Sequence, residues 1–240
     1  MRVIFEQDKN TLIKQTTQVL ENLFTENKDK HILFLTSGGS SFDLLAQLTC
    51  SNKGYKISIG VLDERFNASS AINNFAQLAA TEFFRKSSNL FEEVLDTRFI
   101  DGEILEMFTN RYETLLRNWK AKFPEGIIIA TVGMGPDGHV SGIMPFPENE
   151  PMFHSLFVET PHWVIGYDAG GKNPYPQRAT TTIPFLKNEI DFAVACITGD
   201  GKKAALKRVM AASGKLNETP ARVLLEMKNV TVCTDINTED

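Results

Sequence analysis

Short apolar runs alternate along the chain with longer segments in which apolar residues recur every three or four positions. The short runs have the length and β-branched content of strands, whereas the longer recurrence is typical of one helix face. Predicted strands are RVIF (2–5), HILFLT (31–36), KISIGVLD (56–63), GIIIATVGM (126–134), HWVIGYD (162–168), DFAVACITG (191–199) and NVTVCTD (229–235). Predicted helices cover residues 12–24, 41–48, about 71–84, 104–119 and 201–212.

This alternation predicts an α/β fold, with a mostly parallel central sheet and helices on both faces in a Rossmann-like arrangement. The run at 126–134 is apolar throughout, which favours a strand covered on both faces. Because no linker-like segment, strong repeat or abrupt change of composition interrupts the chain, residues 1–240 are expected to form a single domain. Two long predicted loops, 145–155 and 168–182, are of a length that often contributes to a site.

Composition and charge exclude some classes of function. A hydrophobic fraction of 42% and a charged fraction of 23% are ordinary for a globular protein. The net charge of −5 argues against a general nucleic-acid binder, which needs a positive surface to displace counterions. A local basic pocket for a small anion remains compatible with that total.

The cysteines and the N-terminus indicate a protein of a reducing compartment. Cys50, Cys196 and Cys233 are widely spaced and odd in number, so they form neither a zinc motif nor a complete disulfide framework. We expect buried thiols and no metal. The first fifteen residues resemble neither a signal peptide nor a membrane span, which predicts a cytoplasmic protein that does not contact a membrane.

The first segment with candidate chemistry is TSGGSSFDLL, residues 36–45, where a strand runs into glycines and serines before a helix. Gly38, Gly39, Ser40 and Ser41 are candidate phosphate ligands, because glycine amides and a helix N-terminus can approach an anion closely. The alternative is an ordinary strand-to-helix turn with Ser40 or Ser41 as the N-cap. No GKS or GKT follows, which disfavours a nucleoside triphosphate.

The second segment is VLDERFNASSAINNF, residues 61–75, which places three charged residues at a strand end. Arg65 is a candidate for bidentate contact with phosphate, and Asp63 for orienting a polar substrate or its neighbours. The alternative is a solvated turn with a surface ion pair, which this segment taken alone favours.

The third segment is TVGMGPDGHVSGIMP, residues 131–145. Gly133, Gly135 and Gly138 permit a tight backbone whose amides are candidate oxyanion donors. His139 is the histidine with a setting suited to a general base, and Asp137 is placed to hold its tautomer. The alternative is a surface turn that contains a polar residue.

Two further cations are candidates for anion or sugar contacts. Lys202 lies at the first turn of the helix that follows ITGDG, where a positive charge is unfavourable unless it meets an anion. Arg178 lies in PYPQRATTTIPFL, within the second long loop. The alternative for Lys202 is a side chain directed into solvent.

Taken together and in this order, SGGS, DER, GMGPDGH, PQRATTTIP and TGDGKKAALKRV resemble the 6-phosphogluconolactonase family over essentially the full chain. That family is the lactonase branch of a group that includes glucosamine-6-phosphate deaminase. The resemblance implies hydrolysis of 6-phospho-D-glucono-1,5-lactone to 6-phosphogluconate by one sugar-phosphate-binding domain without a cofactor. It implies His139 as general base, with phosphate held by residues 38–41, Arg65 and Lys202. The expected partner is a small phosphorylated sugar lactone, and the expected state is a monomer or small homo-oligomer.

The chain departs from the family pattern at several places, three of which lie beside candidate site residues. DGHVSGIMP stands where the family has DGHTASLFP, SGGSSF replaces SGGSTP, and FNASSAINN follows DER where Val-Pro is usual. The deaminase branch resembles DGHIAFNEP, with a glutamate where this chain has Met144, which cannot assist proton transfer. The deaminase is therefore the second hypothesis, and a non-catalytic sugar-phosphate sensor is the third.

Overall fold

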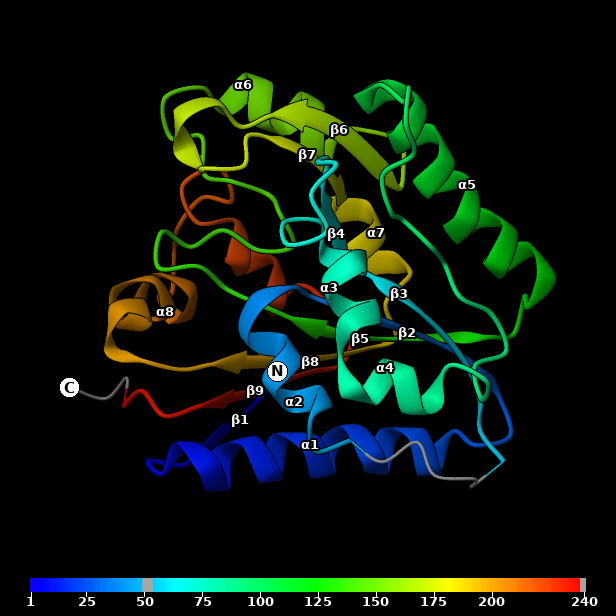
Figure 1. Cartoon of the computed structure of the whole chain (residues 1–240). Coiled ribbons are helices and arrows are strands. Elements are labelled where there is room, and N and C mark those ends of the chain that lie inside the picture. Colours follow the sequence, from blue (N-terminus) through cyan, green and yellow to red (C-terminus); the bar gives the residue numbers. More distant parts are fainter. Residues whose placement is uncertain (49–53, 238–240) are drawn as a thin grey trace.

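A six-stranded parallel sheet lies at the centre of the computed structural model, which describes residues 1–48 and 54–237 (Figure 1). The strand order is β1-β9-β8-β5-β2-β3, and every neighbouring pair is parallel. The strands are β1 (Arg2–Phe5), β2 (His31–Thr36), β3 (Lys56–Val61), β5 (Ile127–Val132), β8 (Phe192–Ile197) and β9 (Val230–Thr234). Each corresponds to an apolar run of the sequence.

Helices cover both faces of this sheet because alternate strand residues point in opposite directions. Ile127 and Ile129 of β5 belong to a core that includes the long helix α1 (Lys9–Glu26), below the sheet in Figure 1. Ile128 and Ala130 belong to the opposite core, with residues of α5 (Leu105–Lys122), α7 (Ile183–Asn188) and α8 (Lys203–Met210). The predicted fold class is thereby confirmed.

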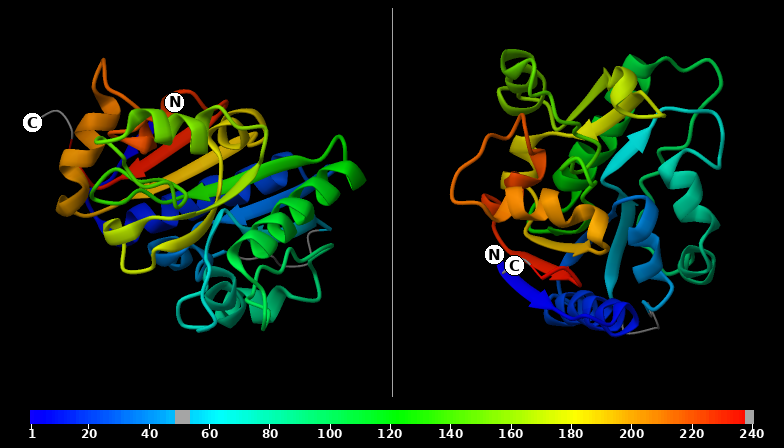
Figure 2. Two further views of the ribbon diagram at one scale, coloured as in Figure 1. Left: turned by 90° about the horizontal axis from the view of Figure 1, so that it is seen from above. Right: turned by 90° about the vertical axis from the view of Figure 1, so that its left-hand side faces the viewer.

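A second sheet of three antiparallel strands was not predicted as such. It has the order β4-β7-β6, with β4 (Asp63–Arg65), β6 (Val164–Asp168) and β7 (Gln177–Thr181), and it stands beside α5 as a separate layer (Figure 2). The predicted loop 168–182 is therefore wrong over β7. This strand forms because it pairs on both sides, with β4 and β6, although QRATT has no apolar alternation.

The helices differ from prediction mainly where capping residues divide them. Residues 41–48 form only the short α2 (Phe42–Leu45), after a 3₁₀ turn at Gly39–Ser41. Thr81 accepts a hydrogen bond from the amide of Phe84 and so divides the segment 71–84 into two helices. These two helices are α3 (Asn74–Ala80) and α4 (Glu82–Ser87). A further short helix is α6 (Glu150–Phe153), and other short helical segments lie at His154–Val158, Gly170–Lys172, Asp200–Lys202 and Pro220–Leu225.

The two cysteines within the described residues are free. Cys196 and Cys233 lie opposite each other on β8 and β9, the first partly buried and the second buried. Burial raises the pKa of the Cys196 thiol to about 11. Cys50 lies outside the described residues. No helix in the described part of the chain has the length and apolar character to cross a membrane.

Candidate active site

The carboxyl ends of four parallel strands open onto one cavity of about 270 Å³. Residues that follow β2, β3, β5 and β8 reach it, as expected for an open parallel sheet. The antiparallel sheet supplies a further wall through β4 and β7. The lining residues are Ser37, Gly38, Gly39, Ser40, Asp63, Arg65, Asn74, Gly133, Met134, Gly135, Pro136, His139, Ser141, Gly142, Arg178 and Lys202.

Ten of the candidate site residues singled out in the sequence line this cavity: Gly38, Gly39, Ser40, Asp63, Arg65, Gly133, Gly135, His139, Arg178 and Lys202. Three others, Ser41, Asp137 and Gly138, do not. Ser41 is buried, and Asp137 contacts the imidazole of His139. The four sequence segments and the second long loop therefore meet at one cavity, although 164 positions separate Gly38 from Lys202 in the chain.

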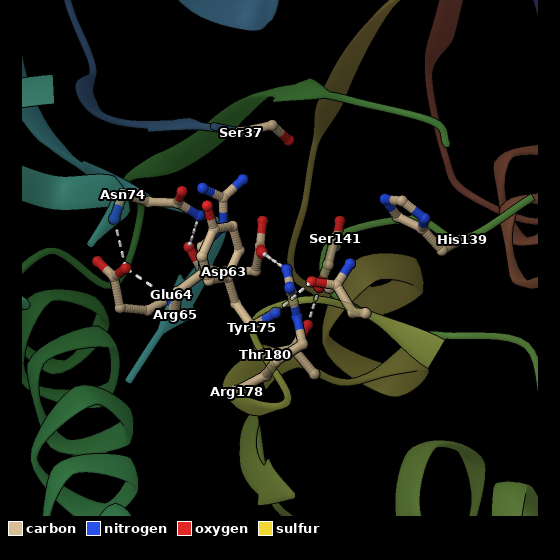
Figure 3. Close-up of polar contacts among 12 residues, drawn as sticks. Ser37, Asp63, Glu64, Arg65, Asn74, His139, Ser141, Tyr175, Arg178 and Thr180 are labelled. Carbon is tan, nitrogen blue, oxygen red and sulfur yellow. Dashed lines mark hydrogen bonds and ion pairs between the residues drawn. The ribbon is translucent and has the colours of Figure 1, made fainter. Parts of the chain in front are cut away.

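His139 is held by its own loop. Its Nδ1 lies 2.7 Å from Oδ1 of Asp137, which also accepts from the His139 amide at 3.1 Å. Burial acts to raise the pKa of Asp137, but the hydrogen bond and charge of His139 outweigh it, so that this pKa is lowered. An ionised Asp137 accepts a hydrogen bond from Nδ1–H of His139, which keeps the proton on Nδ1 and leaves Nε2 as the basic nitrogen. In Figure 3 a ring nitrogen of His139 faces the space shared with Ser141 and Arg178.

The glycines of this loop have a different role from the one predicted. The amides of Gly133, Gly135 and Gly138 donate to Ser37 Oγ, the His139 carbonyl and the Gly135 carbonyl. These three amides are thus engaged within the protein and are not free oxyanion donors. Gly135 is needed for a steric reason, because a Cβ there would lie 2.1 Å from Cε1 of His139.

An arginine that the sequence analysis did not single out fixes the same loop from outside. Arg208 on α8 donates from Nη2 to the Asp137 carbonyl at 3.0 Å and from Nε to Oγ1 of Thr219 at 3.2 Å. The Ala221 amide donates to the Gly138 carbonyl at 3.0 Å. The only sequence signal was the cationic face of helix 201–212.

Asp63 and Arg178 form a buried ion pair at the cavity wall. Nη2 of Arg178 lies 2.8 Å from Oδ2 of Asp63, and their side chains are 5% and 7% exposed, respectively. The interpretation of the DER segment as a solvated turn is therefore wrong for Asp63. Since a buried pair is costly to desolvate, its position beside a cavity indicates a role other than stability alone.

Glu64 organises the residues on either side of it. The oxygens of this fully buried carboxyl group accept from the amides of Arg65, Asn74 and Phe75 and from the hydroxyl of Thr97. Burial raises the pKa of Glu64 to about 8, while these hydrogen bonds act in the opposite direction. Glu64 thereby fixes Arg65 and Asn74 at the cavity, and Asn74 packs so closely on Gly38 that a Cβ there would meet its Oδ1 at 2.5 Å.

Two cations in the cavity have no acidic partner within residues 1–48 and 54–237: Arg65 and Lys202. The Arg65 guanidinium lies over the ring of Tyr175, with its Cζ 5.0 Å from the ring centroid. Figure 3 shows the two side chains together. Burial lowers the pKa of Lys202, against the opposing influence of Cys196 and Asp235. With Arg178, three cations line the cavity against the one carboxylate of Asp63, which suits an anionic ligand.

Four buried polar atoms of the lining residues have no hydrogen-bond partner in the described part of the chain: Arg65 Nε, Asn74 Oδ1, Ser141 Oγ and Arg178 Nε. Buried polar atoms are rarely left unpaired, so their gathering around one cavity indicates a polar ligand. Asn74, Ser141 and Tyr175 were not recognised in the sequence as site residues. No group of three or more His, Cys, Asp or Glu side chains in residues 1–48 and 54–237 is arranged to hold a metal ion.

Comparison with known proteins gives a consistent result. Residues 7–233 match the family model described as glucosamine-6-phosphate isomerases/6-phosphogluconolactonase. A 6-phosphogluconolactonase of Borreliella burgdorferi is 26% identical and aligns over 89% of this chain and 88% of its own. Solved 6-phosphogluconolactonases from Shewanella baltica and Thermotoga maritima share the fold, with TM-scores of 0.74 and 0.71 and identities of 17% and 21%. Each alignment covers 97% of this chain, and 95% and 98% of those chains.

Proposed function

Because the chain belongs to the glucosamine-6-phosphate isomerase/6-phosphogluconolactonase family, we propose that it hydrolyses 6-phospho-D-glucono-1,5-lactone to 6-phosphogluconate. The observation that carries this proposal is the single cavity that His139, Arg65, Lys202 and the Gly38–Ser40 turn all line. A base and an anion site in one cavity suit a substrate with a reactive carbonyl and a distal phosphate. The same cavity supports the view of residues 1–240 as one sugar-phosphate-binding domain, since both sheets contribute to it.

Phosphate binding in this proposal uses Arg65, Lys202 and the Gly38–Ser40 turn. Arg65 and Lys202, which form no ion pair within the described residues, would neutralise a phosphate dianion, and charge-assisted hydrogen bonds to it are strong. Anchoring the phosphate places the lactone carbonyl near His139, so that binding free energy is used for orientation. The Asp63–Arg178 pair is placed to contact the polar groups of the sugar between these two ends.

His139 acts as general base through Nε2 in this proposal, with Asp137 holding the proton on Nδ1. Nε2 takes a proton from water as the water oxygen bonds to C1 of the lactone. The tetrahedral intermediate then breaks the bond from C1 to the ring oxygen, and the imidazolium returns its proton to that oxygen. Water is thereby added across the ester bond, and the product is the open-chain acid.

The test is an assay of the purified chain on freshly generated lactone, with the spontaneous rate subtracted, and on glucosamine 6-phosphate. Lactone hydrolysis that is lost in His139→Asn, while 6-phosphogluconate still binds, supports the proposal. Release of ammonia from glucosamine 6-phosphate without lactone hydrolysis would establish the deaminase instead. Binding without either reaction would favour a sensor.

A further inference from the structure

The turn that follows His139 has an unusual backbone. Val140 and Ile143 exchange two hydrogen bonds, of 3.3 Å and 2.7 Å, and the two residues between them have positive φ angles, 47° for Ser141 and 74° for Gly142. Hairpin turns of this kind favour Asn-Gly or Gly-Gly. Among residues 1–48 and 54–237, Ser141 is the one non-glycine residue with positive φ. Such strain persists where the surroundings impose it and gathers at functional sites.

The surroundings hold this turn firmly in place. The Thr180 hydroxyl donates to the Ser141 carbonyl, and the Tyr167 hydroxyl donates to the Gly142 carbonyl at 2.6 Å. A Cβ on Gly142 would lie 2.9 Å from Oδ2 of Asp63, so the turn rests directly on the Asp63–Arg178 pair. The position of Ser141 is therefore fixed by both strands of the antiparallel sheet that carry these hydroxyls, β6 and β7.

The Ser141 hydroxyl itself has no hydrogen-bond partner among the residues that the structure describes. The residue is 3% exposed, its Oγ is buried without a hydrogen bond, and it lines the cavity. Figure 3 shows Ser141 between the Arg178 guanidinium and the His139 ring. Leaving a buried hydroxyl unpaired is costly, and the neighbouring threonine and tyrosine hydroxyls are both satisfied.

A hydrogen-bond donor at this place would assist the proposed reaction. Negative charge develops on the carbonyl oxygen when water adds to C1, and a preorganised donor stabilises that charge. The Gly133, Gly135 and Gly138 amides are already engaged, and Arg65 and Lys202 are assigned to the phosphate. Two buried donors of the lining residues then remain unpaired within the described part of the chain, Arg178 Nε and Ser141 Oγ. The Arg178 guanidinium is held by Asp63, whereas Ser141 lies two residues from the base.

We infer that Ser141 is a catalytic residue whose hydroxyl donates a hydrogen bond to the lactone carbonyl oxygen as it becomes an oxyanion. The inference rests on the proposed lactonase activity. No proton is transferred by Ser141: the hydroxyl keeps its hydrogen, and the proton from water moves to His139 and then to the ring oxygen. The strained turn serves to aim the hydroxyl.

The experiment compares Ser141→Ala and Ser141→Gly with the wild type on freshly generated lactone, together with binding of 6-phosphogluconate by calorimetry. Both variants lack the hydroxyl, but glycine relieves the positive φ whereas alanine retains it. We expect kcat to fall by about 10²-fold in both variants, because a donor that acts in the transition state is lost. Binding of 6-phosphogluconate should change by less than about threefold, because a contact made only in the transition state contributes little to product affinity. Ser141→Gly should melt at or above the temperature of Ser141→Ala.

Several outcomes would overturn the inference. An unchanged kcat in both variants removes the role. If kcat falls in Ser141→Ala but is at the wild-type level in Ser141→Gly, the loss is caused by backbone strain and not by the missing hydroxyl. An equal loss of kcat/KM and of 6-phosphogluconate affinity makes Ser141 a ground-state contact. A wild type that does not hydrolyse the lactone refutes the proposed function, whereas an active wild type with active variants refutes only the role of Ser141.

Discussion

A Cβ atom on Gly135 would lie 2.1 Å from Cε1 and 2.2 Å from Nδ1 of His139, so the imidazole rests against the Gly135 backbone. Contacts below 3.0 Å cannot be accommodated without movement, and the ring of the proposed base is the group that would move. The tight glycine segment is therefore explained by the space that the histidine needs.

Gly135→Ala should nearly abolish lactone hydrolysis while leaving the fold intact. The φ angle of Gly135 is not in the left-handed region, so alanine adds only the steric conflict with His139 and with Oδ1 of Asp137, which would lie 2.6 Å from the Cβ. We expect kcat to fall by about 10²-fold or more, since small misplacements of a reacting group carry such costs. Gly171→Ala is the matched control, because a Cβ there meets nothing within 4 Å. A fully active Gly135→Ala variant would contradict the role of His139.

Asp137→Asn should lower kcat by about tenfold or more, because an amide can present its N–H to Nδ1 and favour the wrong tautomer. The pKa of Asp137 is lowered, so the carboxylate stays ionised across the neutral range and its own titration should not shape the pH profile there. The measurement is kcat against pH for the variant and for Asp29→Asn, an exposed control. Equal kcat in all three proteins would exclude Asp137 from orienting the base.

Lys202→Met should raise KM by about tenfold, as expected for loss of a hydrogen bond between charged groups. Only the charged amine binds phosphate, so the KM of the wild type should rise as pH climbs through the lowered pKa of Lys202, which lies below 10.5. The variant should lack that rise. A depressed pKa also means that the charge disfavours the folded state below this pKa, so the variant should unfold at the same or a higher temperature.

Exposed Lys207 on the same helix provides the control for that comparison. Lys207→Met should leave KM and its pH dependence unchanged. If both substitutions shift KM alike, the effect belongs to the general charge of α8 rather than to a phosphate contact.

Tyr175→Ala should raise KM by about threefold, because a cation–π contact at a partly exposed site contributes about 0.5–1 kcal/mol to the orientation of Arg65. Tyr175→Phe keeps the aromatic face and should behave as the wild type. A phenylalanine variant as impaired as the alanine variant would indicate that the tyrosine hydroxyl, and not the ring, is important.

Glu64→Gln should destabilise the protein and weaken phosphate binding together. An amide group would turn an N–H toward at least one of the backbone amides that now donate to the carboxyl oxygens. Such a buried mismatch costs about 1–3 kcal/mol in the free energy of unfolding, measured by urea denaturation. Unchanged stability would mean that the site relaxes around the amide.

The strands of the parallel sheet could be predicted because each is an apolar run that can be recognised from its own sequence, as HILFLT and GIIIATVGM show. The contact between Asp137 and His139 was predictable for the same reason, since two positions separate them. The contact between Asp63 and Arg178 spans 115 positions and depends on β4 pairing with β7, whose polar sequence resembles a loop.

The residues missed in the sequence share that dependence on tertiary structure. Asn74 reaches the cavity because Glu64 holds the start of α3. Arg208 of α8 contacts the His139 loop through the Asp137 carbonyl, 71 positions away in the chain. Ser141 is distinguished by its positive φ angle and by a hydroxyl without a hydrogen-bond partner among the described residues. Neither property can be recognised from the amino-acid sequence. The family resemblance identified the chemistry, whereas the supporting contacts required coordinates.

Only Leu62 separates β3 of the large sheet from β4 of the small one. The three residues that follow it, Asp63 to Arg65, pair with β7 and supply the ion pair, the buried carboxylate and a cation of the cavity. Partial opening of the smaller layer would thus dismantle the cavity while the parallel strands stayed intact. As the denaturant concentration is raised, enzymatic activity should therefore be lost before the far-ultraviolet circular dichroism signal, to which the parallel sheet and its helices contribute.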